Sequence, residues 1–330
     1  MKTDSYPRIS GIVISILTII LFGVSYSFFT PEYVAVWPST PHLSLGIAEG
    51  ALYGTGALSI VLGIISIILI AISIYLFSNF IYGNTAIPML FYLTLVLSNP
   101  SSIYFSNLHI AALLLAWGLF SMIDYKAALE EKTEKMFISF FLLTLASLFY
   151  APLFWILPLL ILYIFCSTAS PKKLIISIFG IVTPFIISAA VIYLANGWNT
   201  GLFKSFYQSI VFHNEKIISY GIATIIKILI VTIAMIAAVS HSIKKKDFFT
   251  KPQAESYMGM FIFTVLLTVI AILFLNNTQV PFSILLFIPV SFFLYELSSK
   301  LNIAGKFSIY YSIFCILLLI ERMTIILSAY

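Results

Sequence analysis

The sequence predicts an all-α fold, a polytopic bundle of about eleven membrane-spanning helices in a single domain over residues 1–330. Three observations predict it. Hydrophobic residues make up 61% of the chain and charged residues 9%, the mean hydropathy is +1.10, and apolar runs recur between short polar breaks. A soluble domain carries about a quarter charged residues. Folded in water, this chain would expose more apolar area than a monomer tolerates.

The apolar runs are read as spans because a membrane helix needs about 20 mostly apolar residues. The first run keeps that length and has no small-residue cleavage site, which predicts a retained signal anchor. The fifth run is the shortest and ends at Ala151-Pro152, which is typical of a tilted helix or a tight hairpin. The predicted spans are 9–28, 56–78, 81–98, 108–124, 136–150, 153–169, 174–195, 219–242, 257–275, 282–298 and 307–328.

The basic residues predict the orientation, because cytoplasmic loops carry an excess of Lys and Arg. Alternate loops, counted from the N-terminus, hold thirteen of the seventeen basic residues, whereas the opposite loops hold only Lys204 and Lys216. We therefore expect a cytoplasmic N-terminus and no nucleic-acid partner. The thirteen are Lys2, Arg8, Lys126, Lys132, Lys135, Lys172, Lys173, Lys244, Lys245, Lys246, Lys251, Lys300 and Lys306.

Two predicted outward loops, at about residues 29–55 and 196–218, are longer than a connection needs. Long loops in compact proteins are often functional. Their aromatic residues fit segments that lie on the outer leaflet, and they equally fit belt residues with no other role. The ionisable residues of the two loops are Glu32, His42, Glu49, Lys204, His213, Glu215 and Lys216.

The charged residues Lys227, Glu321 and Arg322 lie deep inside predicted spans. Counted at 1.5 Å per residue, they lie roughly 10 Å below the outer surface. Charges at this depth usually face a bundle interior or a wet cavity. The alternative is that Lys227 extends its ammonium group outward and that Glu321 forms a structural ion pair with Arg322 or Lys227.

The predicted outward turn at residues 98–109 is rich in Ser and Asn and contains Pro100. These residue types suit the end of one helix, a Pro-directed turn and the N-cap of the next helix. His109 follows at the start of that next helix. It is a candidate catalytic residue, and the alternative is a structural histidine.

Several kinds of chemistry have no motif in the sequence. It contains neither GxxxxGK[ST] nor GxGxxG, so no nucleotide site is predicted. It contains no HExxH, CxxC or clustered Cys and His, so no cofactor is predicted and a divalent metal has no supporting motif. Cys166 and Cys315 lie in apolar runs, and two cysteines exclude a disulfide framework.

The turn 99–103, the segment 106–109 and the Ala/Leu-rich span up to Met122 resemble a pattern in polyprenol-dependent membrane glycosyltransferases of the GT-C class. The Tyr/Pro hairpin at 145–152 is also similar to theirs. The stretch from about 88 to 195 resembles, in addition, an uncharacterised family of bacterial inner-membrane proteins, which implies a location in a bacterial cytoplasmic (inner) membrane. The resemblance covers about a third of the chain.

The GT-C resemblance implies a core over about residues 1–218, with additional spans over 219–330. It implies a donor sugar on a polyprenyl phosphate and a carboxylate base in the first outward loop. That position holds Glu32, with Glu49 as the alternative and His109 as a further catalytic candidate. The loop departs from the family pattern because it has no Asp. The residues that would bind the lipid phosphate are Lys204, His213, Lys216, Lys227 and Arg322.

A second reading is a non-catalytic membrane scaffold or a transporter component in envelope assembly or secretion, with other membrane proteins as partners. A transporter usually contains inverted repeats and broken helices near the midplane. The sequence has no convincing repeat, and its polar residues lie toward the outer side. The scaffold is the stronger form of this alternative.

Overall fold

A computed structural model describes most of the chain between residues 56 and 196 and parts of the remainder. The described residues form helices, turns and short connections, and none of them is in a strand. This confirms the all-α class for that part of the chain. The described residues are 16–21, 23, 56–82, 85–127, 133–168, 171–196, 201, 204, 206, 207, 210, 236, 259, 263, 265–267, 283–302, 311–320 and 323.

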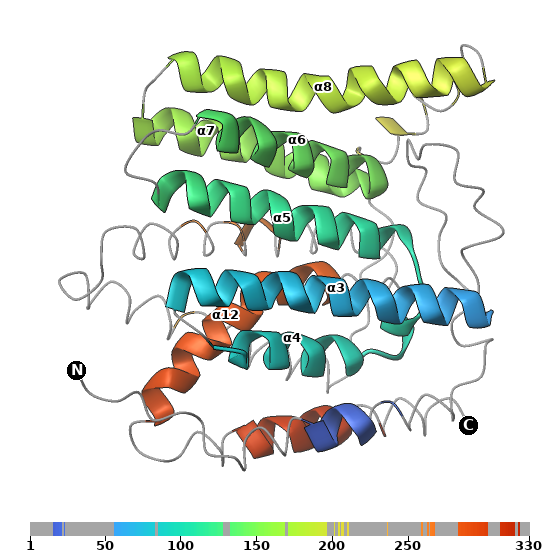
Figure 1. Cartoon of the computed structure of the whole chain (residues 1–330), viewed down its shortest axis with the longest axis vertical. Helices are drawn as coiled ribbons and strands as arrows, with labels where there is room; N and C mark the ends of the chain where they lie inside the picture. The colour runs from blue at the N-terminus through green and yellow to red at the C-terminus, as the bar shows by residue number, and fades with distance from the viewer. Residues whose placement is uncertain are drawn as a thin grey trace.

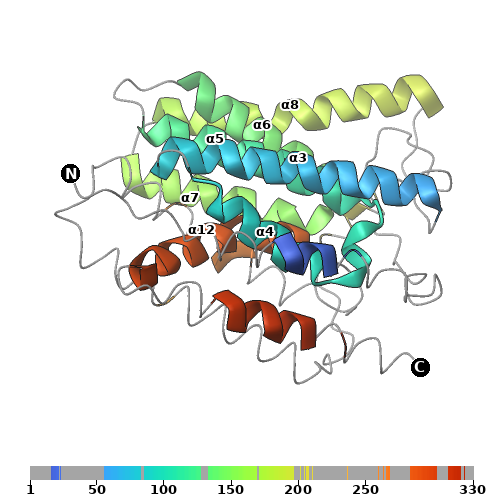
Figure 2. The same cartoon turned by 60° about the horizontal axis from the view of Figure 1, so that its bottom comes forward.

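The helices stack side by side in one bundle (Figures 1 and 2). Helix α5 packs between α3 and α6, α6 packs against α8, and α12 crosses beneath α3 to contact α4 and α5. The elements are α3 (Ala57–Tyr82), α4 (Ile87–Leu97), η3 (Pro100–Ile103), α5 (Asn107–Ala127), α6 (Thr133–Phe149), η4 (Ala151–Trp155), α7 (Ile156–Thr168), α8 (Pro171–Asn196) and α12 (Ser283–Asn302).

Where the structure describes a predicted span, its bounds agree with the helices within a few residues, except around the predicted span 81–98. The predicted spans 9–28, 219–242, 257–275 and 307–328 lie for half or more of their length outside the described residues. Around 81–98, α3 continues to Tyr82, and α4 begins only at Ile87. Asn79 lies near the end of α3, and its Oδ1 accepts the Thr85 N–H at 3.1 Å just before α4 begins. With 11 residues, α4 is about 16 Å long, which is shorter than a bilayer core. The predicted span 81–98 thus contains the last residues of α3 and the whole of α4.

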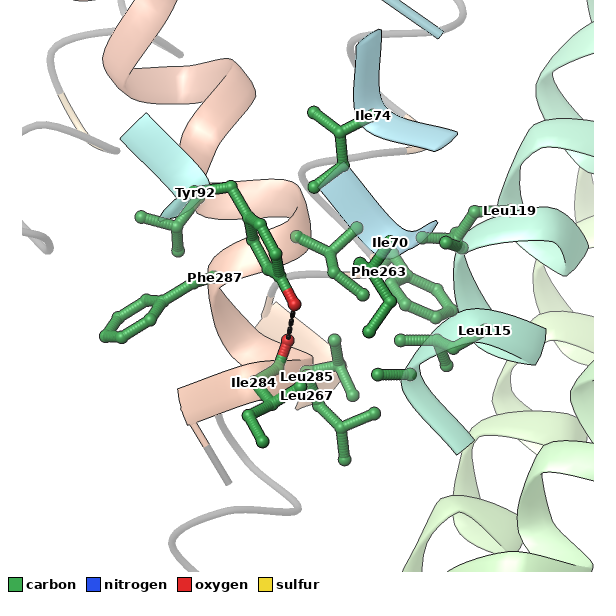
Figure 3. Close-up of a cluster of buried hydrophobic side chains, with 14 of the residues drawn as sticks. Ile70, Ile74, Tyr92, Leu115, Leu119, Phe263, Leu267, Ile284, Leu285 and Phe287 are labelled. Carbon is green, nitrogen blue, oxygen red and sulfur yellow. Dashed lines mark hydrogen bonds between the residues drawn. The ribbon is translucent and has the colours of Figure 1, made fainter. Parts of the chain in front are cut away.

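The core of the bundle joins α3, α4, α5 and α12 (Figure 3). Tyr92 of α4 is fully buried, and its hydroxyl donates a hydrogen bond to the Ile284 carbonyl of α12 at 3.4 Å. Burying a hydroxyl is costly without a partner, so this bond makes a tyrosine acceptable between α4 and α12. The apolar residues drawn around it include Ile70, Ile74, Leu115, Leu119, Phe263, Leu267, Leu285 and Phe287.

Two glycines allow neighbouring helices to approach closely. A Cβ on Gly118 of α5 would lie 3.0 Å from Leu143 Cγ of α6, and one on Gly180 of α8 would lie 2.8 Å from Phe140 Cβ of α6. The hydroxyl of Ser139 crosses the α5–α6 contact and donates to the Gly118 carbonyl at 2.8 Å. Small residues and side-chain hydrogen bonds at contacts are typical of helices that pack within a membrane.

Two described helices, α3 and α8, are long and apolar enough to cross a membrane. In their most apolar stretches only 39% of the α3 residues and 28% of the α8 residues are buried. The exposed side chains are large and apolar, for example Leu58, Ile72 and Phe80 on α3 and Phe179 and Ile186 on α8. Each helix therefore packs one face on the bundle and presents an apolar face outward.

Candidate functional site

The connection between α4 and α5 is a compact turn held by its own serines. Ser98 Oγ donates to the Leu95 carbonyl at 2.7 Å, which ends α4 with a side-chain cap. Ser102 Oγ donates to the carbonyls of Val96 and Asn99, both at 2.7 Å. Both serines are buried. The predicted C-capping role is confirmed for Ser98.

His109 lies inside this turn and is 0% exposed. Its Nδ1 accepts the Ser106 backbone N–H at 3.2 Å, so this nitrogen carries no proton. Its Nε2 lies 2.8 Å from the Ser102 carbonyl, which can only accept, so Nε2 carries the hydrogen. The ring also stacks on Phe105, with 5.8 Å between ring centroids. His109 is thus neutral, with both ring nitrogens bonded to the backbone of its own turn.

The turn is attached to the first turns of α3. The Phe105 N–H donates to Ser59 Oγ at 3.0 Å and to the Ser59 carbonyl at 3.2 Å. One helical turn further along α3, a Cβ on Gly63 would lie only 2.0 Å from the Ile103 carbonyl oxygen. Only glycine leaves room for this approach, because the contacted atoms are backbone. Ser59 and Gly63 together form the surface on which the turn rests.

A second contact joins η4 to the residues that follow α8. Phe206 is 7% exposed, whereas its neighbour Tyr207 is 68% exposed. The indole N–H of Trp155 donates to the Ile210 carbonyl at 3.0 Å. Lys204 is exposed on the same stretch of chain. Phe206 belongs to a small cluster with Leu148, Ala151 and Ile192.

These contacts lie at one end of the bundle. Helices α3 and α5 begin, and α6 and α8 end, toward the right of Figure 1. At the opposite end, Phe77 near the end of α3 meets Phe120 near the end of α5, with 4.0 Å between ring centroids. The predicted outward loops whose flanking residues are described therefore share one end.

Of the candidate site residues, the structure describes His109 and Lys204. It places His109 inside the protein and Lys204 on the surface. In the described part of the chain, no group of three or more His, Cys, Asp or Glu side chains could hold a metal ion. The candidates that lie outside the described residues are Glu32, Glu49, His213, Lys216, Lys227, Glu321 and Arg322.

Two features at the contacts were missed from the sequence. The pair Ser59 and Gly63 has the small-xxx-small spacing typical of close contacts between membrane helices, and that spacing was a usable signal. Glu296 of α12 is 6% exposed. It follows Phe292 and Phe293 by four and three residues, so it shares their buried face. An acidic residue three and four positions after aromatic residues in a predicted span was a second usable signal.

Comparison with known proteins gives one match. A family model described as a family of unknown function, DUF6427, matches residues 49–326. No curated protein matches the chain, and no solved structure matches it. The family match names no activity, so the GT-C resemblance stays a prediction.

Proposed function

The chain belongs to the family of unknown function DUF6427, and we propose its function from the arrangement of its helices and loops. We infer a polytopic integral protein of the bacterial cytoplasmic membrane, with about eleven spans and a cytoplasmic N-terminus. It acts at the extracytoplasmic face on a sugar carried by a polyprenyl phosphate, in the manner of a GT-C glycosyltransferase.

The exposed apolar faces of α3 and α8 support the membrane location. Each helix has 26 residues, which corresponds to about 39 Å, more than the roughly 30 Å of a bilayer core. The core helix of a soluble protein would be buried, and a signal sequence would lie at the N-terminus. Only 39% and 28% of the residues in the apolar stretches of α3 and α8 are buried, unlike those of a soluble core helix, and both helices lie well inside the chain. Lipid is the solvent that tolerates such surfaces.

One observation supports the location of the activity. The described parts of the predicted outward loops gather at one end of the bundle, and Lys204 is exposed there beside Tyr207. A cation at this level can stabilise the charge that develops on a departing lipid phosphate. The acceptor hydroxyl needs a base. We assign that role to Glu32, with Glu49 as the alternative.

The test is a Glu32→Gln, Glu49→Gln double variant. Removing the base is expected to lower glycan product about 100-fold or more, while the amount of folded protein stays at the wild-type level. The measurement is product formed by membranes supplied with lipid-linked sugar. Glu134→Gln is the matched control, because Glu134 is exposed in the first turn of α6, at the other end of the bundle. A wild-type amount of glycan product from the double variant would contradict the proposal.

A membrane scaffold is the second candidate, and the state of His109 favours it. Both ring nitrogens bond to the turn, so this candidate catalytic residue serves the structure. The variant Lys227→Ala distinguishes the scaffold from the enzyme. If the chain is a scaffold, Lys227→Ala is expected to lower protein level or complex assembly; if it is an enzyme, the same variant stays folded and loses product. Quantitative immunoblotting beside the product assay decides between them.

A further inference from the structure

The described residues of the stretch 201–210 are helical and have two different faces. Lys204 and Tyr207 are three residues apart, so they share a face, and both are exposed. Phe206 points the other way and is buried in the cluster that includes Ile192 of α8. The Trp155 indole holds the end of the stretch through the Ile210 carbonyl. The stretch therefore has a protein-facing side and a free side.

The exposed side of this stretch lies next to an exposed, largely apolar surface at the end of α8. Ile192, which contacts the Phe206 cluster, is followed on α8 by Tyr193 and Leu194, which are 57% and 84% exposed. Trp155 of η4 is also exposed. Tyr and Trp collect where a membrane protein passes the headgroup region, because their rings are apolar and their polar atoms are wet. Tyr193, Tyr207 and Trp155 thus mark the level at which the apolar surface ends.

We propose that Lys204 and Tyr207 lie at the outer leaflet, with Tyr207 among the headgroups and the Lys204 ammonium bound to a phospholipid phosphate. This inference rests on the proposed membrane location of α8. It does not require glycosyl transfer, because the bound phosphate is that of a membrane phospholipid. Lysine binds phosphate as a point charge and can reach it while its methylene groups cover apolar surface. A free phosphate would leave Tyr207 and Leu194 in water, so the partner is a lipid and not a soluble anion.

Spin labels at defined positions test the depth of the stretch. The full chain, with Cys166 and Cys315 replaced, is labelled singly at Lys204, Tyr207, Leu194, Ile186 or Ile178 and placed in phospholipid nanodiscs. All five positions are exposed, so the labels should not disturb the packing. The measurement compares collision rates with oxygen, which concentrates in lipid, and with a water-soluble nickel chelate.

The expected order of depth follows from α8. Ile186 lies about 12 Å below Leu194 along the helix, so its label should have the highest collision rate with oxygen. The label at Ile178, nearer the opposite membrane surface, should have a lower rate. The label at Tyr207 should fall between those at Leu194 and Lys204. If Tyr207 reports water while α8 shows the gradient, the inference is wrong and the membrane location stands. If the three α8 labels all report water, the membrane location itself is wrong.

The phosphate contact has its own test. Lys204→Ala is expected to weaken phosphatidylglycerol binding about fivefold, the effect of one lysine near an anionic surface. Lys204→Arg should restore it, and excess inorganic phosphate should not compete. Native mass spectrometry of retained lipid gives the measurement. Wild-type binding by Lys204→Ala, or displacement of the lipid by inorganic phosphate, would overturn the assignment of Lys204.

Discussion

Gly63→Ala is expected to lower the stability of the protein by about 3 kcal/mol, at the upper end of the usual cost of overpacking. The new Cβ would lie 2.0 Å from the Ile103 carbonyl oxygen, 2.9 Å from its carbonyl carbon and 3.1 Å from the Phe105 nitrogen. These are backbone atoms, so no side-chain rotation relieves the clash. The turn must move off α3, and the Phe105–Ser59 hydrogen bonds are then lost. Thermal unfolding of purified protein in detergent measures the effect.

Two other glycines serve as controls. An added Cβ on Gly56, just before α3, has no atom within 4 Å, so Gly56→Ala should unfold at the wild-type temperature. On Gly118 the nearest atoms belong to the Leu143 side chain, which can shift, so Gly118→Ala should cost less than Gly63→Ala. Equal stabilities for Gly63→Ala and Gly56→Ala would contradict the close contact between the turn and α3.

His109→Ala is expected to have an effect of similar size, a loss of about 3 kcal/mol. Removing the ring leaves the Ser102 carbonyl and the Ser106 N–H buried without the partners they have in the native protein. Each such group costs about 1–3 kcal/mol. The empty ring volume adds a cavity in contact with Phe105. Thermal unfolding again measures the loss, and the amount of protein in the membrane should fall with it.

The controls for His109 separate its hydrogen bonds from its shape. His109→Phe keeps a ring of similar size and removes both bonds, so it should be nearly as unstable as His109→Ala. Ser106→Ala removes only the hydroxyl, 3.2 Å from Nδ1, and keeps the backbone donor, so its effect should be small. Wild-type stability in His109→Phe would show that the two hydrogen bonds contribute little.

Much of the helical fold could be predicted because apolar runs and polar breaks follow directly from residue type. Helices α5, α6 and α8 lie where the runs at 108–124, 136–150 and 174–195 predict them. The boundary between α3 and α4 could not be read in this way. It depends on how the chain folds there: α3 continues past Asn79 to Tyr82, and Asn79 Oδ1 accepts the Thr85 N–H just before α4 begins.

The site was harder to predict because its contacts join residues far apart in the sequence. The sequence placed His109 at the start of a helix, but its neutral state follows from the fold of residues 102–109, which brings the Ser102 carbonyl to Nε2. The exposure of Tyr207 and the burial of Phe206 likewise depend on the Phe206 cluster. The sequence pattern alone does not show which distant residues the fold brings into contact.

The central claim is that the protein is a membrane-embedded bundle whose predicted outward loops share one end. Cysteine accessibility tests it most directly. In a chain with Cys166 and Cys315 replaced, Lys204→Cys and Glu134→Cys each place one exposed thiol near opposite ends of the bundle. In right-side-out membrane vesicles, an impermeant maleimide should label Lys204→Cys at once and Glu134→Cys only after permeabilisation. Labelling of both positions in sealed vesicles, or of Glu134→Cys alone, would contradict the claim.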